Sequence, residues 1–293
     1  MTDFDLLTKA AQTFNLDNIK HSELLTYPLS NQNFVVTFYS GEKYIFRILK
    51  GQTLGGLQEE FLVRDTVDNQ GLPTSSFLLN KEGKRFSIVD EHVVTVSPLI
   101  AGTHPTTVTL AMCHEMGRRL GQFHTATQIL TLKKKGWMSF EVAQKSLHHL
   151  KTYAKRADTT SISIIEKVLG ESPQLFEQVL PRGVIHGDYQ YENLLFQGEQ
   201  IVAVLDFEES ENNLLIVDIA RSVANLRNWT DFSFESLQET FFAGYQTSRL
   251  ITAAERQAYE MAHNYSCAAC AIWMFNRDYL NTGYNYLGQI QSE

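Results

Sequence analysis

Cysteine and long apolar segments are scarce in this sequence, which argues against two classes of protein. The three cysteines are an odd number in a chain of 293 residues, unlike the disulfide framework of a small secreted domain. The longest apolar run, Cys267 to Phe275, covers nine residues, whereas a bilayer-spanning helix needs about 20. The acidic N-terminus MTDFDLLTKAAQTFNL lacks the basic start of a secretory signal. We therefore expect a cytoplasmic protein with reduced cysteines and no membrane partner.

Positive charge is also in short supply. The formal net charge of −8 argues against broad electrostatic binding to nucleic acid or anionic lipid. The length of 293 residues exceeds the size at which a single hydrophobic core usually stops growing, so two lobes are expected. The oligomeric state has no signature in the sequence.

Hydrophobic periodicity and turn residues predict a β-rich first lobe with one inserted helix. The chain opens with a helix, because Thr2 and Asp5 have the spacing of a capping box before an amphipathic segment. The other elements expected in this lobe are strands over 33–39 and 43–49, a helix over 58–70, and strands over 75–79, 86–89 and 93–96.

The rest of the chain is predicted to be mainly helical, interrupted by two short strands within 182–208. The expected helices cover 109–125, 139–155 and 161–169. Further helices follow Val217, and two of them are expected to open at the capping boxes Ser236 with Glu239 and Thr252 with Glu255. We expect an N-terminal lobe over 1–96, a hinge over 97–102 and a C-terminal lobe over 103–293.

The segment VIHGDYQYENLLFQGEQIVAVLDFE, residues 184–208, places polar groups at the edges of two apolar strands. Two neighbouring strands would bring Asp188, Asn193 and Asp206 to one edge. Phosphoryl transfer needs such a set, because a carboxylate must accept the proton of the attacking hydroxyl and hard oxygen ligands must hold Mg²⁺. The alternative is that these residues cap turns, but His-x-Asp-x4-Asn occurs by chance in only about one sequence in a hundred of this length.

These motifs resemble those of a known family. HGDYQYEN followed by VLDFE is similar to the catalytic loop and metal-binding segment of the kinase-like small-molecule phosphotransferases, which include aminoglycoside phosphotransferases, choline kinases and type II homoserine kinases. LSNQNFVV and YIFRIL resemble the nucleotide-covering hairpin and third strand of that family, and MGRRLGQFH and IVDIAR resemble two of its helices.

The resemblance implies an α+β fold, namely a bilobal protein-kinase-like fold with a small β-rich N-terminal lobe and a larger, mainly helical C-terminal lobe. It implies that Asp188 is the catalytic base and positions the acceptor hydroxyl. It also implies that Asn193 and Asp206 hold Mg²⁺, and that ATP or GTP is the co-substrate.

The phosphate-binding residues are expected in the first lobe, where the sequence departs from the family. The third-strand cation, often Lys in the family, falls on Arg47, which can still bind phosphates bidentately. The hairpin turn contains no glycine, so Ser30, Asn31 and backbone amides are expected to supply its phosphate contacts. A surface ion pair for Arg47 and an ordinary polar turn are the alternatives.

The resemblance also suggests an ion pair and an adenine contact. Glu60 on the inserted helix is expected to pair with Arg47, and Glu59 is the alternative partner. Leu99 and Ile100 in the hinge are the candidates for backbone contacts to the adenine.

The downstream half indicates the class of acceptor. Asp206-Phe207 is followed by Glu and not by Gly, and no Ala-Pro-Glu occurs, which argues against a protein kinase. Acidic and aromatic side chains suit an acceptor with ammonium groups. The expected acceptor contacts are Glu208, Asp218, Trp229, Tyr265 and Trp273. Core packing is the alternative for the aromatic residues, and hydrogen bonding to the catalytic loop is the alternative for Asp218.

Several other side chains receive provisional roles. His186 and His124 are expected to be buried structural residues, and Glu209 and Glu211 are expected to lie in a solvated turn. If the acceptor carries a carboxylate, Arg221 or Arg227 is the candidate that would bind it. These alternatives stay open at the level of the sequence.

The sequence thus predicts a small-molecule kinase that phosphorylates a hydroxyl group of a small, amine-bearing acceptor. Aminoglycosides, choline or ethanolamine, and homoserine all stay open as acceptors. The alternative from another class is a nucleotide-binding pseudokinase or scaffold, which Arg47 and the glycine-free turn would suit.

Overall fold

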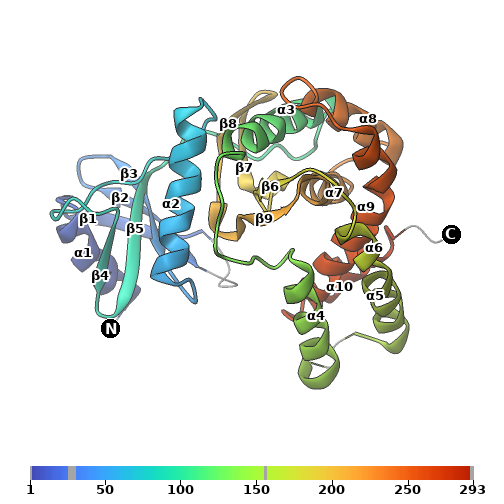
Figure 1. Cartoon of the computed structure of the whole chain (residues 1–293). Helices are drawn as coiled ribbons and strands as arrows, with labels where there is room; N and C mark the ends of the chain where they lie inside the picture. Colours follow the sequence, from blue (N-terminus) through green and yellow to red (C-terminus); the bar gives the residue numbers. More distant parts are fainter. Residues whose placement is uncertain (1, 26–30, 155–156, 291–293) are drawn as a thin grey trace. The chain divides into compact units, whose positions relative to one another are not determined.

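The computed structural model describes residues 2–25, 31–154 and 157–290. Its chain forms two compact units, the first made of 1–57 and 74–101 and the second of 58–73 and 102–293. The first unit is built around a β-sheet and the second is mainly helical (Figure 1), which confirms the α+β bilobal fold. The expected lobe boundaries stay a prediction, and 58–73 groups with the second unit.

The first unit is a five-stranded antiparallel sheet with one helix. The strands have the order β1-β2-β3-β5-β4. Alternating apolar residues of the strands and one face of α1 form its core, in which Leu7, Phe46 and Val94 are buried. Thr2 and Asp5 form the expected capping box at the start of α1. The elements of this unit are α1 (Asp3–Thr13), β1 (Ile19–Leu24), β2 (Gln32–Phe38), β3 (Lys43–Ile48), β4 (Phe86–Val89) and β5 (His92–Pro98).

The second unit holds most of the helices. Helix α2 (Leu54–Asn69) belongs largely to this unit, because Val63 and Val67 pack in its hydrophobic core. The other helices are α3 (Leu110–Thr127), α4 (Phe140–His149), which continues as one π-helical turn (Leu150–Ala154), α5 (Thr159–Glu171), α6 (Pro173–Phe176), α7 (Leu215–Leu226), α8 (Phe234–Tyr245), α9 (Ala253–Phe275) and α10 (Leu280–Leu287).

Two antiparallel strand pairs in this unit carry the motif segment. Strand β6 (Arg182–Ile185) pairs with β9 (Glu211–Leu214), and β7 (Leu194–Gln197) pairs with β8 (Gln200–Val204). Short 3-10 turns precede β7 and follow β8, over Tyr191–Asn193 and Phe207–Glu209.

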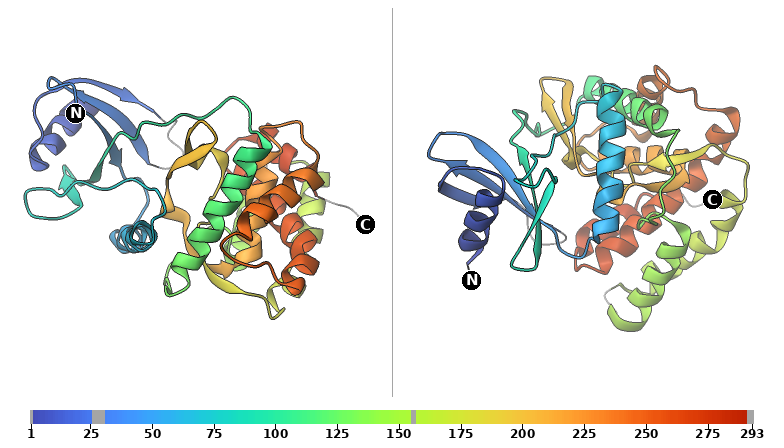
Figure 2. Two further views of the ribbon diagram at one scale, coloured as in Figure 1. Left: turned by 90° about the horizontal axis from the view of Figure 1, so that it is seen from above. Right: turned by 60° about the vertical axis from the view of Figure 1, so that its left-hand side comes forward.

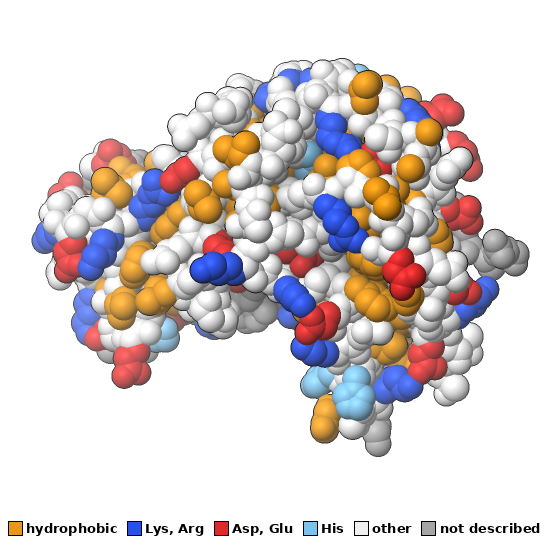
Figure 3. Space-filling model, in the orientation of Figure 1, with side chains coloured by type: hydrophobic (Ala, Val, Ile, Leu, Met, Phe, Trp, Pro, Cys, Tyr) orange, Lys and Arg blue, Asp and Glu red, His pale blue; other side chains and the backbone are white. Residues whose placement is uncertain are grey.

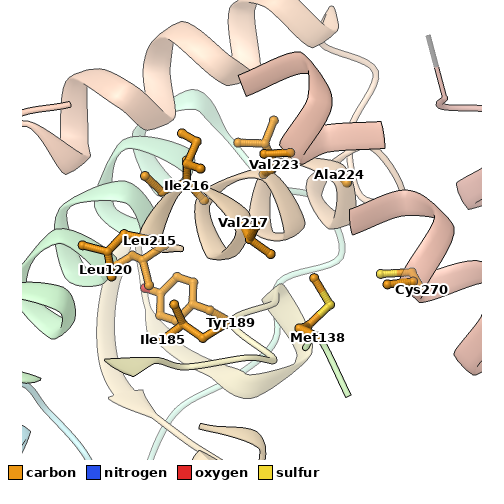
Figure 4. Close-up of a cluster of buried hydrophobic side chains, with 14 of the residues drawn as sticks. Leu120, Met138, Ile185, Tyr189, Leu215, Ile216, Val217, Val223, Ala224 and Cys270 are labelled. Carbon is orange, nitrogen blue, oxygen red and sulfur yellow. The ribbon is translucent and has the colours of Figure 1, made fainter. Parts of the chain in front are cut away.

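Helix α7 lies at the centre of the hydrophobic core of the second unit. All twelve of its residues are buried, so the helix has no solvent-facing side. Figure 4 shows side chains of α7, among them Ile216 and Val217, surrounded by residues from several other elements, such as Leu120 of α3 and Cys270 of α9. The polar residues of α7, among them Asp218 and Arg221, are therefore buried as well.

Helices α3 and α8 lie side by side and touch backbone to backbone (Figures 1 and 2). A Cβ atom at Gly117 would come within 2.1 Å of the Phe241 carbonyl oxygen, and one at Gly244 within 1.9 Å of the His114 carbonyl oxygen. Such approaches are far shorter than van der Waals contact, so both positions require glycine. The two helices are thus packed at the minimum separation.

Two local predictions were wrong, and two strands were missed. The segment 75–79 forms no strand, although Leu78 N–H donates one hydrogen bond to the Val96 carbonyl at 2.8 Å. Helix α8 begins at Phe234, and its N-cap is Ser233 and not Ser236. Strands β1 and β9 were not predicted, because IKHSEL and ENNL contain too few apolar residues for a strand signal. The capping box of Thr252 and Glu255 at α9 is confirmed.

The cysteines, the surface charges and the lengths of the helices can be compared with the expectations from the composition. Cys113, Cys267 and Cys270 are buried free thiols. On the face shown in Figure 3, acidic and basic side chains are interspersed over the described residues. None of the helices formed by 2–25, 31–154 and 157–290 has the length and apolar character needed to cross a membrane.

Candidate active site

The residues of the motif segment meet at one end of the β7–β8 hairpin. Asn193 precedes β7 and Asp206 follows β8, and because the strands are antiparallel both residues lie at the same end. Leu205 N–H donates to the Asn193 carbonyl at 2.9 Å. The Nδ2 group of Asn193 donates to Oδ2 and to the backbone carbonyl of Asp188, both at 2.9 Å. The structure thus joins Asp188 to the hairpin, although β6, which leads to Asp188, pairs with β9.

Asp218 of α7 holds the backbone of the His-Gly-Asp loop. Its Oδ2 accepts from His186 N–H at 2.8 Å, and its Oδ1 accepts from Gly187 N–H at 3.1 Å. His124 Nε2 lies 3.1 Å from the same Oδ2. Burial alone would raise the pKa of Asp218, but these hydrogen bonds and the two histidines lower the pKa overall.

This position contradicts the expected contact of Asp218 with an acceptor. The carboxylate is 1% exposed, and both oxygens already accept hydrogen bonds. The alternative considered from the sequence, in which Asp218 hydrogen-bonds the loop, agrees with the geometry. Asp218, in the segment IVDIAR, therefore supports the His-Gly-Asp loop and does not line the acceptor site.

His186 and His124 are buried, as the sequence predicted. His186 Nε2 lies 3.1 Å from the Leu205 carbonyl, which links the loop to the end of β8. Burial lowers the pKa of His186 to about 4, so the ring is neutral at physiological pH. His124 Nδ1 lies 2.6 Å from the hydroxyl of Tyr245, so α8 also supports the loop through α3.

Two residues of the site have left-handed backbone conformations. Gly187 has φ 80°, and a Cβ there would approach the Glu209 carbonyl oxygen to 2.2 Å, so only glycine fits. Asp206 has φ 61°, a region that Asp and Asn tolerate better than other side chains. Its carboxylate also accepts from Glu208 N–H at 3.4 Å. The backbone therefore turns sharply on both sides of the site.

Asp188 lies in an electrostatic setting that places its titration near neutral pH. Burial raises the pKa of Asp188 to about 7, and the nearby carboxylates of Asp206 and Glu209 add to the rise. Arg221 opposes the rise, because its Nη2 lies 3.2 Å from Asp188 Oδ1. The Asp188 side chain stays 22% exposed, so it can be reached from solvent.

Arg221 was not predicted to contact Asp188. Its side chain is 2% exposed, and Nη2 also donates to Gln190 Oε1 at 2.5 Å. Nη1 donates to the hydroxyl of Tyr286 at 3.1 Å, and the guanidinium lies over the ring of Trp137. The sequence signal that could have found it is its position three residues after Asp218, within the IVDIAR segment.

The suggestion that Arg221 or Arg227 binds an acceptor carboxylate loses its first candidate. Arg221 is committed to Asp188 and Gln190. Arg227 is exposed and lies over the ring of Phe234. Of the two arginines, Arg227 therefore stays the candidate that would bind an acceptor carboxylate.

The side-chain oxygens of Asn193 and Asp206 suit a hard divalent cation whose remaining ligands are phosphate and water oxygens. The nitrogen of the Asn193 amide is used by Asp188, so the amide oxygen is the atom that could bind a metal. Asp206 supplies an exposed carboxylate at the same end of the hairpin. Within the part of the chain that the structure describes, no three His, Cys, Asp or Glu side chains form a metal-binding group. Mg²⁺ commonly uses one or two protein oxygens plus phosphates and water, which this pair would suit.

The expected acceptor contacts differ in burial. Tyr265 is 0% exposed, its hydroxyl donates to the Met138 carbonyl at 2.8 Å, and its ring packs on Phe176. This burial contradicts its predicted contact with an acceptor, because the core already surrounds it. Glu208 is half-buried beside Asp206.

Two tryptophans stay near the site. Trp229 is half-buried and packs on Tyr191 in the catalytic loop, with ring centroids 4.8 Å apart. Trp273 is half-buried and packs on Trp137, which in turn contacts Arg221. The contact of either tryptophan with an acceptor stays a prediction.

Glu211 lies in a different environment from that predicted. It is 1% exposed, and its carboxylate accepts from Gly136 N–H at 2.8 Å and from Asn213 Nδ2 at 3.1 Å. Burial raises the pKa of Glu211 to about 7. The prediction of a solvated turn was wrong because β9 pairs with β6 and carries Glu211 into the interior.

The residues predicted to bind phosphates lie partly outside the described part of the chain. Ser30 falls on residues that the structure does not describe. Asn31 is buried, and its Oδ1 accepts from Lys50 N–H at 2.9 Å. Arg47 on β3 lies over the ring of Phe77.

The hinge and the two glutamates are better defined. Leu99 N–H donates to the Lys43 carbonyl at 3.2 Å, and Ile100 follows it without regular structure. Glu59 of α2 accepts hydrogen bonds from Lys133 N–H and Lys134 N–H at 2.8 and 3.1 Å. Glu60 is 4% exposed. Both oxygens of Glu59 accept from backbone amides, and the pairing of Glu60 with Arg47 stays a prediction.

Known sequences similar to this chain include homoserine kinases. The homoserine kinase of Pseudomonas aeruginosa (strain LESB58) is 24% identical over 243 residues, which cover 81% of this chain and 75% of the relative. That of Bradyrhizobium sp. (strain BTAi1 / ATCC BAA-1182) is 25% identical over 267 residues, which cover 87% of this chain and 78% of the relative.

Similar solved structures share the fold. An amicoumacin kinase in complex with AMP-PNP, Ca²⁺ and Ami has a TM-score of 0.80 at 16% identity, covering 99% of this chain and 93% of its own. A spectinomycin phosphotransferase in complex with ADP and spectinomycin has a TM-score of 0.67 at 14% identity, covering 99% and 94%. A choline/ethanolamine kinase family protein from Mesorhizobium loti has a TM-score of 0.66 at 16% identity, covering 93% and 88%.

The family assignment rests on a match to the model of a protein family. Residues 25–260, which include the candidate catalytic loop and both candidate metal ligands, match the phosphotransferase enzyme family. The match spans well over half of the 293 residues. Together with the kinase-like fold and the similar homoserine and amicoumacin kinases, this match shows that the chain is a small-molecule kinase that belongs to the phosphotransferase enzyme family.

Proposed function

We propose that the protein transfers the γ-phosphoryl group of ATP or GTP to a hydroxyl group of a small, amine-bearing molecule. The observation that carries the proposal is the contact of Asp188 with Asn193 at the hairpin end where Asp206 follows β8. A carboxylate that titrates near pH 7 in a reachable position suits a proton acceptor at physiological pH.

Asp188 has the central role in the proposed reaction. The acceptor hydroxyl oxygen bonds to the γ-phosphorus, and the bond from that phosphorus to the bridging oxygen of the leaving nucleoside diphosphate breaks. Asp188 positions the hydroxyl and accepts its proton. Arg221 and Asn193 keep the carboxylate oriented through the contacts described above. Asn193 and Asp206 would hold Mg²⁺, which neutralises charge on the phosphates when bound.

The nucleotide-binding assignments are proposals for the first unit and for α2. Arg47 would bind phosphates, and Ser30 and Asn31 would lie in the turn that approaches them. Glu60 would orient Arg47. The Leu99 N–H group already donates to the Lys43 carbonyl, so it is not assigned to the adenine. We assign the adenine contacts to the other backbone groups of Leu99 and Ile100.

The acceptor is proposed to contact Glu208, Trp229 and Trp273. Carboxylates and aromatic rings both attract positive charge, so these residue types favour an acceptor with an ammonium group. The similar proteins named above include kinases of homoserine, choline/ethanolamine and antibiotics, and hydroxylated amines of these kinds are the candidates. The proposed partners are thus small molecules and not nucleic acid or membrane, and a cytoplasmic location suits such substrates.

The experiment that tests this function is a panel of hydroxylated amines with ATP and with GTP. Nucleoside-diphosphate release would be measured by a coupled assay, and the product would be identified by mass spectrometry. We expect at least one acceptor whose mass increases by one phosphate, and loss of that product with Asp188→Asn. Nucleotide binding without transfer to any acceptor would instead support a pseudokinase.

A further inference from the structure

The loop between α3 and α4 is held by carboxylates and amides from elements distant in the sequence. This loop, residues 132–138, is called the lysine loop below because it contains three consecutive lysines. Glu59 of α2 accepts from two of its backbone N–H groups, at Lys133 and Lys134. Glu211 of β9 accepts from a third, at Gly136.

The side chain of Asn212 of β9 fixes the start of the lysine loop. Its Oδ1 accepts from Leu132 N–H at 3.2 Å, and its Nδ2 donates to the Leu132 carbonyl. At the end of the loop, the Met138 carbonyl accepts from Asn213 and from Tyr265. These hydrogen bonds to the backbone restrict the motion of the loop. The Lys134 side chain, which the loop carries, is therefore held in a defined position.

That place is the turn next to the proposed metal ligand. Lys134 Nζ donates to the backbone carbonyl of Glu208, and it lies 3.6 Å from Glu209 Oε2. Glu208 and Glu209 belong to the 3-10 turn that follows Asp206 directly. A Cβ at Gly136 would come within 2.8 Å of the Glu209 carbonyl oxygen, so the loop and this turn are in contact over several residues.

The three lysines of the loop differ in their surroundings. The Lys134 side chain is 26% exposed and reaches the turn, whereas the Lys135 side chain is 61% exposed and pairs with Glu141 of α4. Lys133 is exposed. A merely solvated lysine run would leave all three side chains in water.

We propose that Lys134 is a positioning residue for the metal-binding turn, and that Glu59 keeps the lysine loop, and with it Lys134, in place. Asp206 has a left-handed backbone conformation, and the donor from Lys134 to the turn holds the backbone immediately after it. This inference rests on the proposed role of Asp206 in binding Mg²⁺. It extends the metal site to Lys134 and Glu59, neither of which touches the ion.

The test measures how strongly nucleotide binding depends on Mg²⁺. ADP and GDP would be titrated by calorimetry at a series of Mg²⁺ concentrations, using the full chain. Loss of a residue that supports a metal ligand commonly weakens metal binding by about 10- to 100-fold. We expect Lys134→Gln to raise the half-maximal Mg²⁺ concentration about 10-fold, and Lys134→Arg to restore most of the loss.

Lys135→Gln is the matched control, because it removes the same charge from the same loop without the contact to Glu208. Removal of a positive charge near the site would by itself strengthen Mg²⁺ binding, so this variant should leave the half-maximal Mg²⁺ concentration equal or slightly lower. Glu59→Gln should shift it in the same direction as Lys134→Gln. The double variant should shift it by less than the product of the two changes, since both act through one loop.

The outcomes separate this inference from the proposed function. If the wild-type protein binds neither nucleotide in a Mg²⁺-dependent way, the proposed function fails. If wild-type binding depends on Mg²⁺ and Lys134→Gln behaves like Lys135→Gln, the positioning role of Lys134 is refuted. A melting temperature for each variant checks folding, and Glu59→Gln and Lys134→Arg give an independent answer if Lys134→Gln does not fold.

Discussion

Arg221 Nη2 lies 3.2 Å from Asp188 Oδ1, and the two side chains differ sharply in exposure. The arginine side chain is 2% exposed and the aspartate side chain 22%. The cation therefore lies beneath the carboxylate, on the protein side, while the carboxylate faces outward. A buried cation in this position favours the ionised form of the carboxylate that it contacts.

The pH dependence of turnover should report this ion pair. With the pKa of Asp188 raised to about 7, the ionised carboxylate that can accept a proton is lost as the pH falls through 7, so kcat/KM should decline on the acid side. Arg221→Gln removes the group that opposes the rise, so the acid limb should move to higher pH. Rates measured from pH 5.5 to 9.5 check this, with Arg221→Lys as the charge-retaining comparison. An unchanged limb in Arg221→Gln would separate Arg221 from Asp188.

Asp188→Asn should reduce kcat by at least about 10²-fold while nucleotide affinity changes little. The substitution removes the proton acceptor but keeps the size of the side chain, so the loss should fall on the transition state and not on ground-state binding. Steady-state kinetics together with calorimetry of nucleotide binding provide the measurement. Most of the turnover surviving in the variant would exclude Asp188 as the base.

Asp206→Ala should abolish the Mg²⁺ dependence of nucleotide binding. The substitution deletes the anionic ligand of the proposed metal site, and Asn193 alone is a weak ligand. Calorimetry with and without Mg²⁺ measures the effect. Asp231→Ala is the control, because Asp231 is an exposed carboxylate of the same unit. Equal metal dependence in both variants would contradict the assignment.

Glu211→Gln should change how stability depends on pH. The pKa of Glu211 is raised by burial to about 7, so the folded protein binds a proton that the unfolded chain releases above about pH 4.5. The wild type therefore loses stability as the pH rises from 4.5 to 7, by up to about 3 kcal/mol from this group. Glu211→Gln lacks that loss. Urea denaturation at pH 5 and 8 should show a smaller decrease for the variant, and parallel decreases would refute the shift.

Patterns among residues close together in the sequence predicted much of the fold and the set of polar residues in the segment 184–208. The β2–β3 hairpin, helix α3 and the capping boxes of α1 and α9 follow from neighbouring residues, whose signals are strong at short range. The burial of His186 was also predicted from the sequence and is confirmed. The predicted Asp188, Asn193 and Asp206 set also depends on segments within 20 residues of each other.

The partners of buried polar groups could not be predicted in the same way. Arg221 lies 33 residues from Asp188 in the sequence, and Glu59 lies 74 residues from Lys133. Those contacts depend on how α7 and α2 pack against other elements of the fold, which hydrophobic periodicity alone does not give. Tyr265 was misassigned for this reason, since an aromatic residue looks the same in a core as in a binding wall.

The glycine contact between α3 and α8 also limits how the catalytic loop can move. His124 is on α3 and Tyr245 is on α8, and their side chains meet at 2.6 Å before His124 reaches Asp218. With Gly117 and Gly244 leaving no spare space, the two helices cannot slide past each other without breaking this chain of hydrogen bonds. We therefore expect α3 and α8 to move together as one rigid pair. The loop that carries Asp188 should then keep a constant position relative to both helices.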